Sequence, residues 1–203
     1  GPLTNLALAI KKDRDAVARY RRIIVAGGAH KVTGDASPVA ETNFWIDPEA
    51  AQWVVDSGIA ISIIGLDMTK QIVLTPNHRE LLRQMDSVLT TWLVRASRTL
   101  LNAHWAQNRV LGSSIPAAAA VAAALFPSLF SFERYPASVA VDGLNRGQLI
   151  LDPLGDPDSG EQTAVSWCEE IQRAEIVAHI LASCGPEDWT EREVRRCLLA
   201  CRD

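Results

Sequence analysis

The stretch of sequence that decides this fold is Gly34-Asp35-Ala36-Ser37-Pro38-Val39-Ala40-Glu41-Thr42-Asn43-Phe44-Trp45-Ile46-Asp47-Pro48-Glu49-Ala50-Ala51. Its first half is a polar loop punctuated by glycine and proline. Its second half begins a helix, because Asp47 is a favourable N-cap and Pro48 suits the first helical position. A polar loop fixed to a helix entry can hold several oxygens and amides in a set geometry. This predicts a site for a small polyhydroxylated ligand.

Two short β-branched runs flank this stretch. The first lies in residues 22–28 and ends in a glycine pair, and the second occupies residues 60–64 and ends at Gly65. Continuous apolar strands that alternate with helices are typical of a parallel sheet covered by helices. We therefore predict an α/β fold with an open, mostly parallel sheet and helices on both faces. Ligands of such sheets sit at the carboxyl ends of strands, here residues 27–33 and 65–69.

The rest of the chain yields further expectations. Helical spacing predicts helices over residues 3–20, 47–57, 116–125 and 187–199, and two more between residues 78 and 107. Residues 139–141 and 149–151 read as paired strands, residues 152–162 as a flexible linker, and residues 176–181 as a helix or strand. Trp92 and Trp105 stand at helical spacing, which favours core packing over base stacking.

Composition narrows the functional class. The chain has 203 residues, of which 48% are hydrophobic and 22% charged, as expected for a single globular domain. A net charge of -4 gives no reason to expect a nucleic-acid partner. No apolar run is long enough to span a membrane, and no signal peptide is visible. We therefore expect a cytoplasmic protein without a membrane partner.

The four cysteines all lie in the last quarter of the chain. Cys197 and Cys201 share one face of a predicted helix, but paired spacings that suit a metal are missing. Reduced thiols in a cytoplasmic protein are the simplest interpretation.

Several segments together resemble the inosine/uridine-preferring nucleoside hydrolases. The quoted stretch is similar to the ribose-binding segment of that family, and four more motifs follow the family order: Gly1-Pro2-Leu3-Thr4-Asn5, Ala26-Gly27-Gly28-Ala29, Gly65-Leu66-Asp67-Met68-Thr69 and Leu144-Asn145-Arg146-Gly147-Gln148. The resemblance covers residues 1–152 and fades beyond them. It implies one nucleoside hydrolase-like domain over residues 1–203, with residues 153–203 as a divergent C-terminal part.

The resemblance also implies a chemistry. Enzymes of this family hydrolyse the N-glycosidic bond of ribonucleosides to ribose and free base with a bound calcium ion. By resemblance, the backbone carbonyl of Thr4 would ligate calcium. Glu41 and Asn43 would bind ribose hydroxyls, and Asp35 occupies the position of a ribose-binding asparagine. The resemblance assigns no catalytic residue in this chain.

The chain departs from the family pattern at the metal site. The acidic cluster that supplies most calcium ligands and the general base has no counterpart here, and Ala117 stands where counting predicts a metal-binding aspartate. Asp35 places an anion beside Glu41, where like charges repel unless a cation compensates. We expect the chain to bind calcium poorly and to hydrolyse nucleosides slowly or not at all.

Alternatives remain open at this point. Glu41 and Asn43 could cap backbone groups, Asp35 could be an ordinary turn residue, and Asp67 could be structural. The chain could be a catalytically inactive relative kept as a binding or assembly protein, or a gene fragment. It does not begin with methionine, which favours a truncated or internal start. A sheet that lacks its first strands would expose an edge, so we also expect self-association, such as a homo-oligomer.

Overall fold

A computed structural model describes residues 1–108, 111–160 and 162–200. The chain divides into two compact units. The first unit comprises Gly1–Thr69 and Ala123–Ile171, and the second comprises Lys70–Ala122 and Gln172–Asp203.

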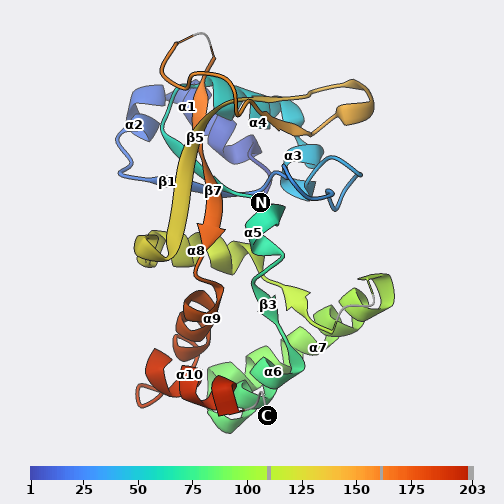
Figure 1. Cartoon of the computed structure of the whole chain (residues 1–203), viewed down its shortest axis with the longest axis vertical. Helices are drawn as coiled ribbons and strands as arrows, with labels where there is room; N and C mark the ends of the chain where they lie inside the picture. Colours follow the sequence, from blue (N-terminus) through green and yellow to red (C-terminus); the bar gives the residue numbers. More distant parts are fainter. Residues whose placement is uncertain (109–110, 161, 201–203) are drawn as a thin grey trace. The chain divides into compact units, whose positions relative to one another are not determined.

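The first unit holds the main sheet and the helices packed on it (Figure 1). Its elements are α1 (Thr4–Lys12), α2 (Arg14–Ala18), β1 (Ile23–Ala26), α3 (Thr42–Ile46), α4 (Pro48–Asp56), β2 (Ile61–Ile64), α5 (Leu66–Thr69), η1 (Pro127–Leu129), β5 (Phe130–Val139), η2 (Gly143–Asn145), β6 (Leu149–Leu151) and β7 (Ala164–Ile171).

The sheet has the strand order β1-β2-β7-β5-β6. β1, β2 and β7 run parallel, in a register that pairs Ile23 with Ile61 and Ile63 with Trp167. This confirms the expected α/β fold with a parallel central sheet. β5 and β6 continue the sheet antiparallel, and Figure 1 shows β5 and β7 side by side. The carboxyl ends of β1, β2 and β7 therefore lie at one edge.

The helix predicted over residues 3–20 is two helices. Asp13 lies between α1 and α2 in a non-helical conformation, with φ -157° and ψ 88°. Its side chain accepts a hydrogen bond from the backbone N–H of Ala16 and so caps α2. Aspartate competes for backbone donors in this way, and the apolar spacing does not reveal the break.

The stretch quoted above contains one more helix than predicted. α4 begins at Pro48, and Asp47 accepts from the backbone N–H of Ala50, which confirms the predicted cap. Residues 42–46, predicted as loop, form α3 instead, with Glu41 as its N-cap. A five-residue helix has too few turns for an apolar period to identify it.

The core lies between the sheet and the helices α1 and α4. Val54, Ile63 and Trp167 are among its fully buried side chains. Trp167 lies directly against Gly65, at which an added Cβ would stand 1.9 Å from the indole ring. A glycine at the end of β2 thus makes room for the largest side chain of the core.

The C-terminal half of the sheet differs from its prediction. The strand predicted at residues 139–141 is β5, which begins at Phe130 and ends at Val139. Residues 152–160 and 162, the described part of the segment predicted to be a linker, follow β6 within the first unit. β7 itself was not predicted, although it is the middle strand. Its run Val165, Trp167 and Cys168 is buried on both faces, which obscures the alternation of a strand.

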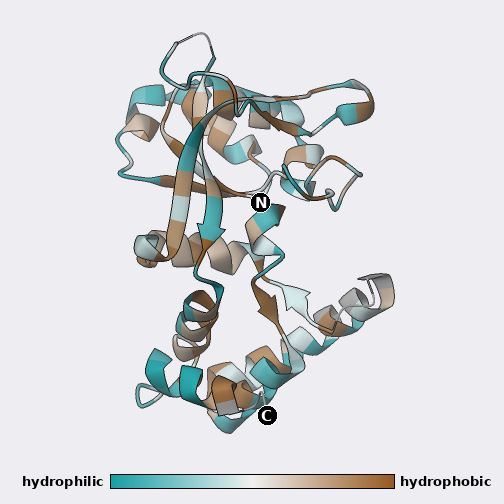
Figure 2. Ribbon diagram, viewed as in Figure 1, coloured by the Kyte–Doolittle hydropathy of each residue, from teal (hydrophilic) through white to brown (hydrophobic). Residues whose placement is uncertain are grey.

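The second unit is mostly helical. It contains β3 (Val73–Leu74), α6 (Pro76–Gln84), α7 (Val88–Asn108), β4 (Ser113–Ser114), α9 (Arg173–Ala182) and α10 (Glu191–Ala200), and most of α8 (Pro116–Leu125). Figure 2 shows both hydrophilic and hydrophobic residues along α6 and α10, as in amphipathic helices.

The structure can be compared with two of three predictions for this unit. The helix predicted from residue 187 begins at Glu191, because Thr190 and Glu193 form a capping box with bonds in both directions. The core packing predicted for two tryptophans is wrong, since Trp92 is 61% exposed and Trp105 is 45% exposed. The Cys197–Cys201 pair cannot be compared, because Cys201 lies outside the described residues.

None of the helices in the described part of the chain combines the length and the apolar character that a bilayer crossing requires.

The contact between Gly65 and Trp167 gives a stability prediction. We expect Gly65→Ala to lower the free energy of unfolding by about 2 kcal/mol or more, because overpacked cores lose about 1–3 kcal/mol and the added methyl would overlap the buried indole. Urea denaturation followed by circular dichroism measures this change. In a Trp167→Phe background the same substitution should cost less, because the ring atom nearest the methyl is gone. An equal cost in both backgrounds would disprove the contact.

Candidate functional site

The candidate site is built around the loop that follows β1. Gly27 and Gly28 begin this loop at the carboxyl edge of the sheet. An added Cβ on Gly27 would stand 2.7 Å from the ring of Phe44 and 3.0 Å from Oε2 of Glu41. Gly28 has φ +76°, a conformation that favours glycine. The glycine pair therefore allows the backbone to approach Glu41 closely.

Glu41 joins this loop to the start of α3. The side chain is only 6% exposed, and its Oε2 accepts from the backbone N–H groups of Gly28 (3.3 Å), Asn43 (2.9 Å) and Phe44 (3.4 Å). Through Oε2, Glu41 therefore caps backbone groups, which is one of the roles that the sequence left open for it. Among the described residues, no group donates to the other oxygen, Oε1.

The environment of Glu41 changes its titration. Burial and, to a smaller extent, the negative charge of Asp35 raise the pKa of this carboxyl to about 7, against the lowering effect of the three N–H donors. A carboxyl with a pKa near neutrality can be present in either protonation state under physiological conditions. Such groups are common at functional sites.

In Asn43 and Asp35, as in Glu41, one polar atom is hydrogen-bonded to the protein and a second polar atom is not bonded to any described residue. Asn43 Nδ2 donates to the carbonyl oxygen of Ala26 at 3.0 Å, so the amide is anchored at the end of β1. Asp35 Oδ1 accepts from the backbone N–H and the hydroxyl of Thr42, at 2.8 and 3.0 Å. The bonds described for these two residues leave Asn43 Oδ1 and Asp35 Oδ2 without a donor among the described residues.

The loop of residues 34–40 is held by its own backbone. The N–H groups of Asp35, Ala36 and Ser37 all approach the carbonyl oxygen of Ala40, at 3.1 to 3.3 Å. Gly34 is required here, because a Cβ would stand 2.1 Å from that same oxygen. This compact loop presents Asp35 next to the start of α3.

Asp67 has a role in the scaffold. It lies on α5 after β2, is 7% exposed, and accepts from the backbone N–H groups of His30 (3.0 Å) and Lys31 (2.7 Å). Residues 27–33 and 65–69 therefore meet, as the sequence predicted for two neighbouring strand ends. The structural interpretation of Asp67 is the one that these bonds support.

Thr4, predicted to offer its carbonyl to calcium, is the first residue of α1. Its hydroxyl donates to Oδ2 of Asp47, the residue that caps α4. This bond lowers the pKa of Asp47 more than any other contact. It connects Thr4 to the C-terminal part of the quoted stretch.

The sequence did not reveal a cluster formed by the neighbouring strands β5 and β7 together with the loop after β1. Lys31 Nζ lies 2.5 Å from Oε2 of Glu169. The hydroxyl of Tyr135 lies within hydrogen-bond distance of carboxylate oxygens of Glu169 (3.0 Å) and Glu133 (2.8 Å), and its single proton serves these two acceptors. The bond to Lys31 lowers the pKa of Glu169, and the bond to Glu133 raises the pKa of Tyr135. Glu169 follows Trp167 on the same face of β7, so recognising that strand would have located the cluster.

The described residues do not form a metal centre of their own. Among the described residues, no group of three or more His, Cys, Asp or Glu side chains is placed to hold a metal ion. The carboxylates of Glu41 and Asp67 already accept backbone N–H donors. Calcium takes six to eight oxygen ligands, so the described residues do not fit a complete calcium site.

Comparison with known proteins identifies relatives of this chain. A family model described as inosine-uridine preferring nucleoside hydrolase matches residues 1–178. The match continues past residue 152, where the resemblance was expected to fade, so β7 also belongs to the shared region.

Individual relatives agree with the family model. A probable uridine nucleosidase 2 from Arabidopsis thaliana is 32% identical over 151 residues, which cover 74% of this chain and 47% of that protein. The inosine-uridine preferring nucleoside hydrolase of Leishmania major is 30% identical over 153 residues, covering 75% and 48%. The chain thus spans about half the length of the curated relatives it matches.

Solved structures show the same fold. A plant nucleoside hydrolase superposes with a TM-score of 0.83 at 29% identity, covering 92% of this chain and 60% of that chain. A purine-preferring ribonucleoside hydrolase from Gardnerella vaginalis superposes with a TM-score of 0.78 at 25% identity, covering 100% and 60%.

The raised pKa of Glu41 gives a prediction for stability against pH. The folded state holds this proton up to a pKa of about 7, whereas the ordinary value is 4.5, so unfolding releases a proton between these pH values. The free energy of unfolding should therefore fall by roughly 3 kcal/mol as pH rises through this window, because each unit of pKa difference corresponds to about 1.4 kcal/mol. Urea titrations of the wild type and Glu41→Gln isolate this contribution as a difference. A difference that stays constant or grows in the opposite direction would contradict the assignment.

Proposed function

This chain belongs to the inosine-uridine preferring nucleoside hydrolase family, and we propose that it carries the ribose-binding part of an enzyme that hydrolyses the N-glycosidic bond of ribonucleosides. Ribonucleoside and water would yield ribose and the free base. The proposal applies to Glu41, Asn43 and Asp35 as ribose ligands.

The observation that carries the proposal is that each of these side chains has one polar atom bonded to the protein and one oxygen available to a ligand. Glu41, Asn43 and Asp35 each use one polar atom to hold the backbone around β1 and α3. Each keeps a second oxygen to which no described residue donates. Oxygens on fixed side chains are suitable acceptors for sugar hydroxyls, because little conformational entropy is lost on binding.

The geometry supports a role in positioning the sugar. Cleavage of a glycosidic bond develops positive charge on the ribose, and hydroxyl groups held by anionic acceptors stabilise that charge. Glu41 is suited to this task when ionised, and Asp35 adds negative charge next to it. Asn43, anchored on the carbonyl of Ala26, would orient a second hydroxyl.

The calcium ion expected from the family lacks a matching set of ligands among the described residues. The described residues do not fit a complete calcium site, and Ala117 offers no oxygen ligand from its side chain. The hydroxyl of Thr4 donates to Asp47, so this side chain is part of the contact between α1 and the start of α4. We therefore propose that residues 1–203 alone hydrolyse nucleosides slowly or not at all, while retaining affinity for ribose.

The names of the relatives favour a hydrolase over the binding or assembly alternative. The Arabidopsis thaliana relative is a probable uridine nucleosidase, and the Leishmania major relative is a nucleoside hydrolase. Ribonucleosides are accordingly the substrate class of the proposal.

We also propose that the protein is cytoplasmic and forms a homo-oligomer. Cys168, Cys184 and Cys197 are free thiols in the described structure, which supports a reducing compartment such as the cytoplasm. β1 is an edge strand of the sheet, which supports the expected homo-oligomer.

Titration calorimetry with ribose at pH 8 tests the proposed binding role. In Glu41→Gln the amide oxygen can still accept from the three backbone N–H groups, but the atom in the position of Oε1 becomes an NH₂ donor. We expect this change to weaken ribose binding by about tenfold or more, because hydrogen bonds to charged groups contribute about 1.5–3 kcal/mol. Asn43→Ala should weaken binding as well.

Asp56→Asn is the matched control, because Asp56 is an exposed carboxylate on α4 outside the site. Equal ribose affinity in the wild type, Glu41→Gln and Asn43→Ala would rule out these ligands. A reducing-sugar assay on inosine and uridine tests the activity. Turnover of about 1 s⁻¹ or faster that a chelator and Glu41→Ala abolish would overturn the expected impairment.

A further inference from the structure

A cavity of about 400 Å³ is lined only by residues of the second unit. Residues of β3, of the start of α6, of α9 and of α10 line it. Its volume is within the range of small-molecule sites, and its apolar lining includes Val177 and Leu198.

The charged lining of this cavity has one sign. Lys70, Arg173 and Arg195 contribute to it, and among the described lining residues none is aspartate or glutamate. Arg195 is paired with Glu175 at 3.0 Å, so its charge is partly balanced. Arg173 takes part in none of the ion pairs of the described residues. The cavity therefore keeps an excess of positive charge.

His78 lines the same cavity as Arg173. The His78 ring is half-buried at the start of α6, where its Nδ1 lies 3.1 Å from the backbone N of Thr75 and 3.0 Å from the carbonyl oxygen of Val73. Burial lowers the pKa of His78, and the charge of Arg173 lowers it further. The capping contacts hold the ring in place.

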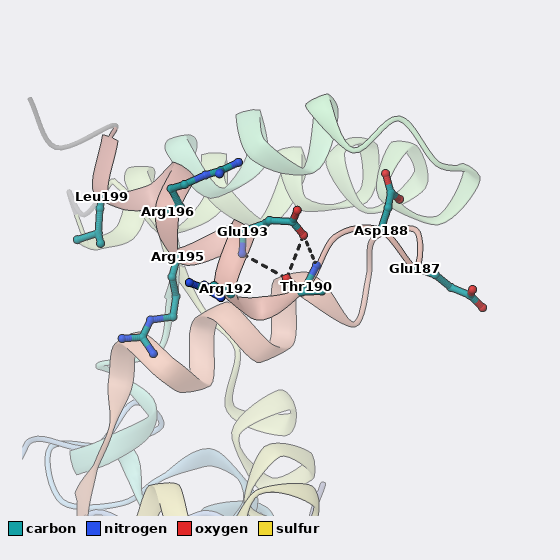
Figure 3. A pocket seen from close by; sticks show the side chains of 8 residues that line it. All are labelled: Glu187, Asp188, Thr190, Arg192, Glu193, Arg195, Arg196 and Leu199. Carbon is teal, nitrogen blue, oxygen red and sulfur yellow. Dashed lines mark hydrogen bonds between the residues drawn. The ribbon is translucent and has the colours of Figure 1, made fainter.

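A second hollow in the same unit has a different character. It measures about 670 Å³ and lies along α10, where Arg192 and Arg196 are accompanied by Glu187, Asp188 and Glu193 (Figure 3). Figure 3 shows the carboxylate of Glu193 bonded to Thr190. Because cations and carboxylates are mixed there, this hollow does not select an anion. The two hollows share Arg195 and Leu199, whereas Arg192 lines only the second one and is therefore a suitable control position.

We propose that the cavity between α6, α9 and α10 binds a small molecule that carries a phosphate group, with Arg173 as its main ligand. A guanidinium offers a planar fork of N–H donors that matches phosphate oxygens in two bonds. Lys70 adds a second cation, and the apolar side with Val177 and Leu198 accommodates the remainder of the ligand. This binding is independent of ribose recognition by Glu41, which lies in the first unit.

Titration calorimetry on the full chain tests this site with inorganic phosphate and with glycerol phosphate, at constant ionic strength set by chloride. We expect one site per chain and tighter binding of glycerol phosphate, which can also contact the apolar side. Arg173→Gln should weaken both affinities by about tenfold or more. Arg192→Gln, which removes an exposed arginine of α10 outside the cavity, should leave them unchanged.

A second variant separates lost binding from lost folding. Ala174→Glu introduces a carboxylate into the cavity lining at the first turn of α9, where acidic residues favour the helix dipole, so the fold should be kept. We expect it to abolish phosphate binding, with an unchanged circular dichroism spectrum. Absence of binding to the wild type would overturn the proposal. Equal weakening by Arg173→Gln and Arg192→Gln would also overturn it, because it would indicate a general charge effect.

Discussion

Two buried carboxylates hold the loop after β1, and the rest of the candidate site depends on them. Glu41 accepts the N–H of Gly28 from the side of α3, and Asp67 accepts those of His30 and Lys31 from the side of α5. A buried carboxylate is unfavourable unless it is hydrogen-bonded, and a buried N–H is unfavourable without an acceptor. Each group thus satisfies the other, and the loop is fixed between two strand ends.

The same bonds explain why Glu41 is both structural and available for chemistry. Oε2 alone meets the three backbone donors, so Oε1 is left for another partner. Three donors would ordinarily stabilise the anion, but burial and the neighbouring Asp35 outweigh them and raise its pKa to about 7. A hydroxylated ligand would add donors to this site and relieve part of that electrostatic strain.

The central strand shows where sequence interpretation reaches its limit. β7 pairs with β2 about 100 residues earlier in the chain, and Trp167 requires the space that Gly65 provides. Neither relation is visible within a short window of residues, because the strand is buried on both faces and lacks a clear alternation. The exposed Trp92 is the opposite case, since its helical spacing suggested a core position that tertiary packing does not provide. The cluster of Lys31, Glu169 and Tyr135 was missed for the same reason as β7.

The sequence by itself determined the features that depend on near neighbours. The cap at Asp47, the proline at the start of α4, the glycine pair after β1 and the family motifs all act over a few residues, so they could be predicted from their order. Only the tertiary structure decided which oxygen of Glu41 is occupied, how far its pKa rises, and which strands meet at the site. Those properties depend on burial and on partners brought together by the sheet. Local sequence patterns do not encode such distances.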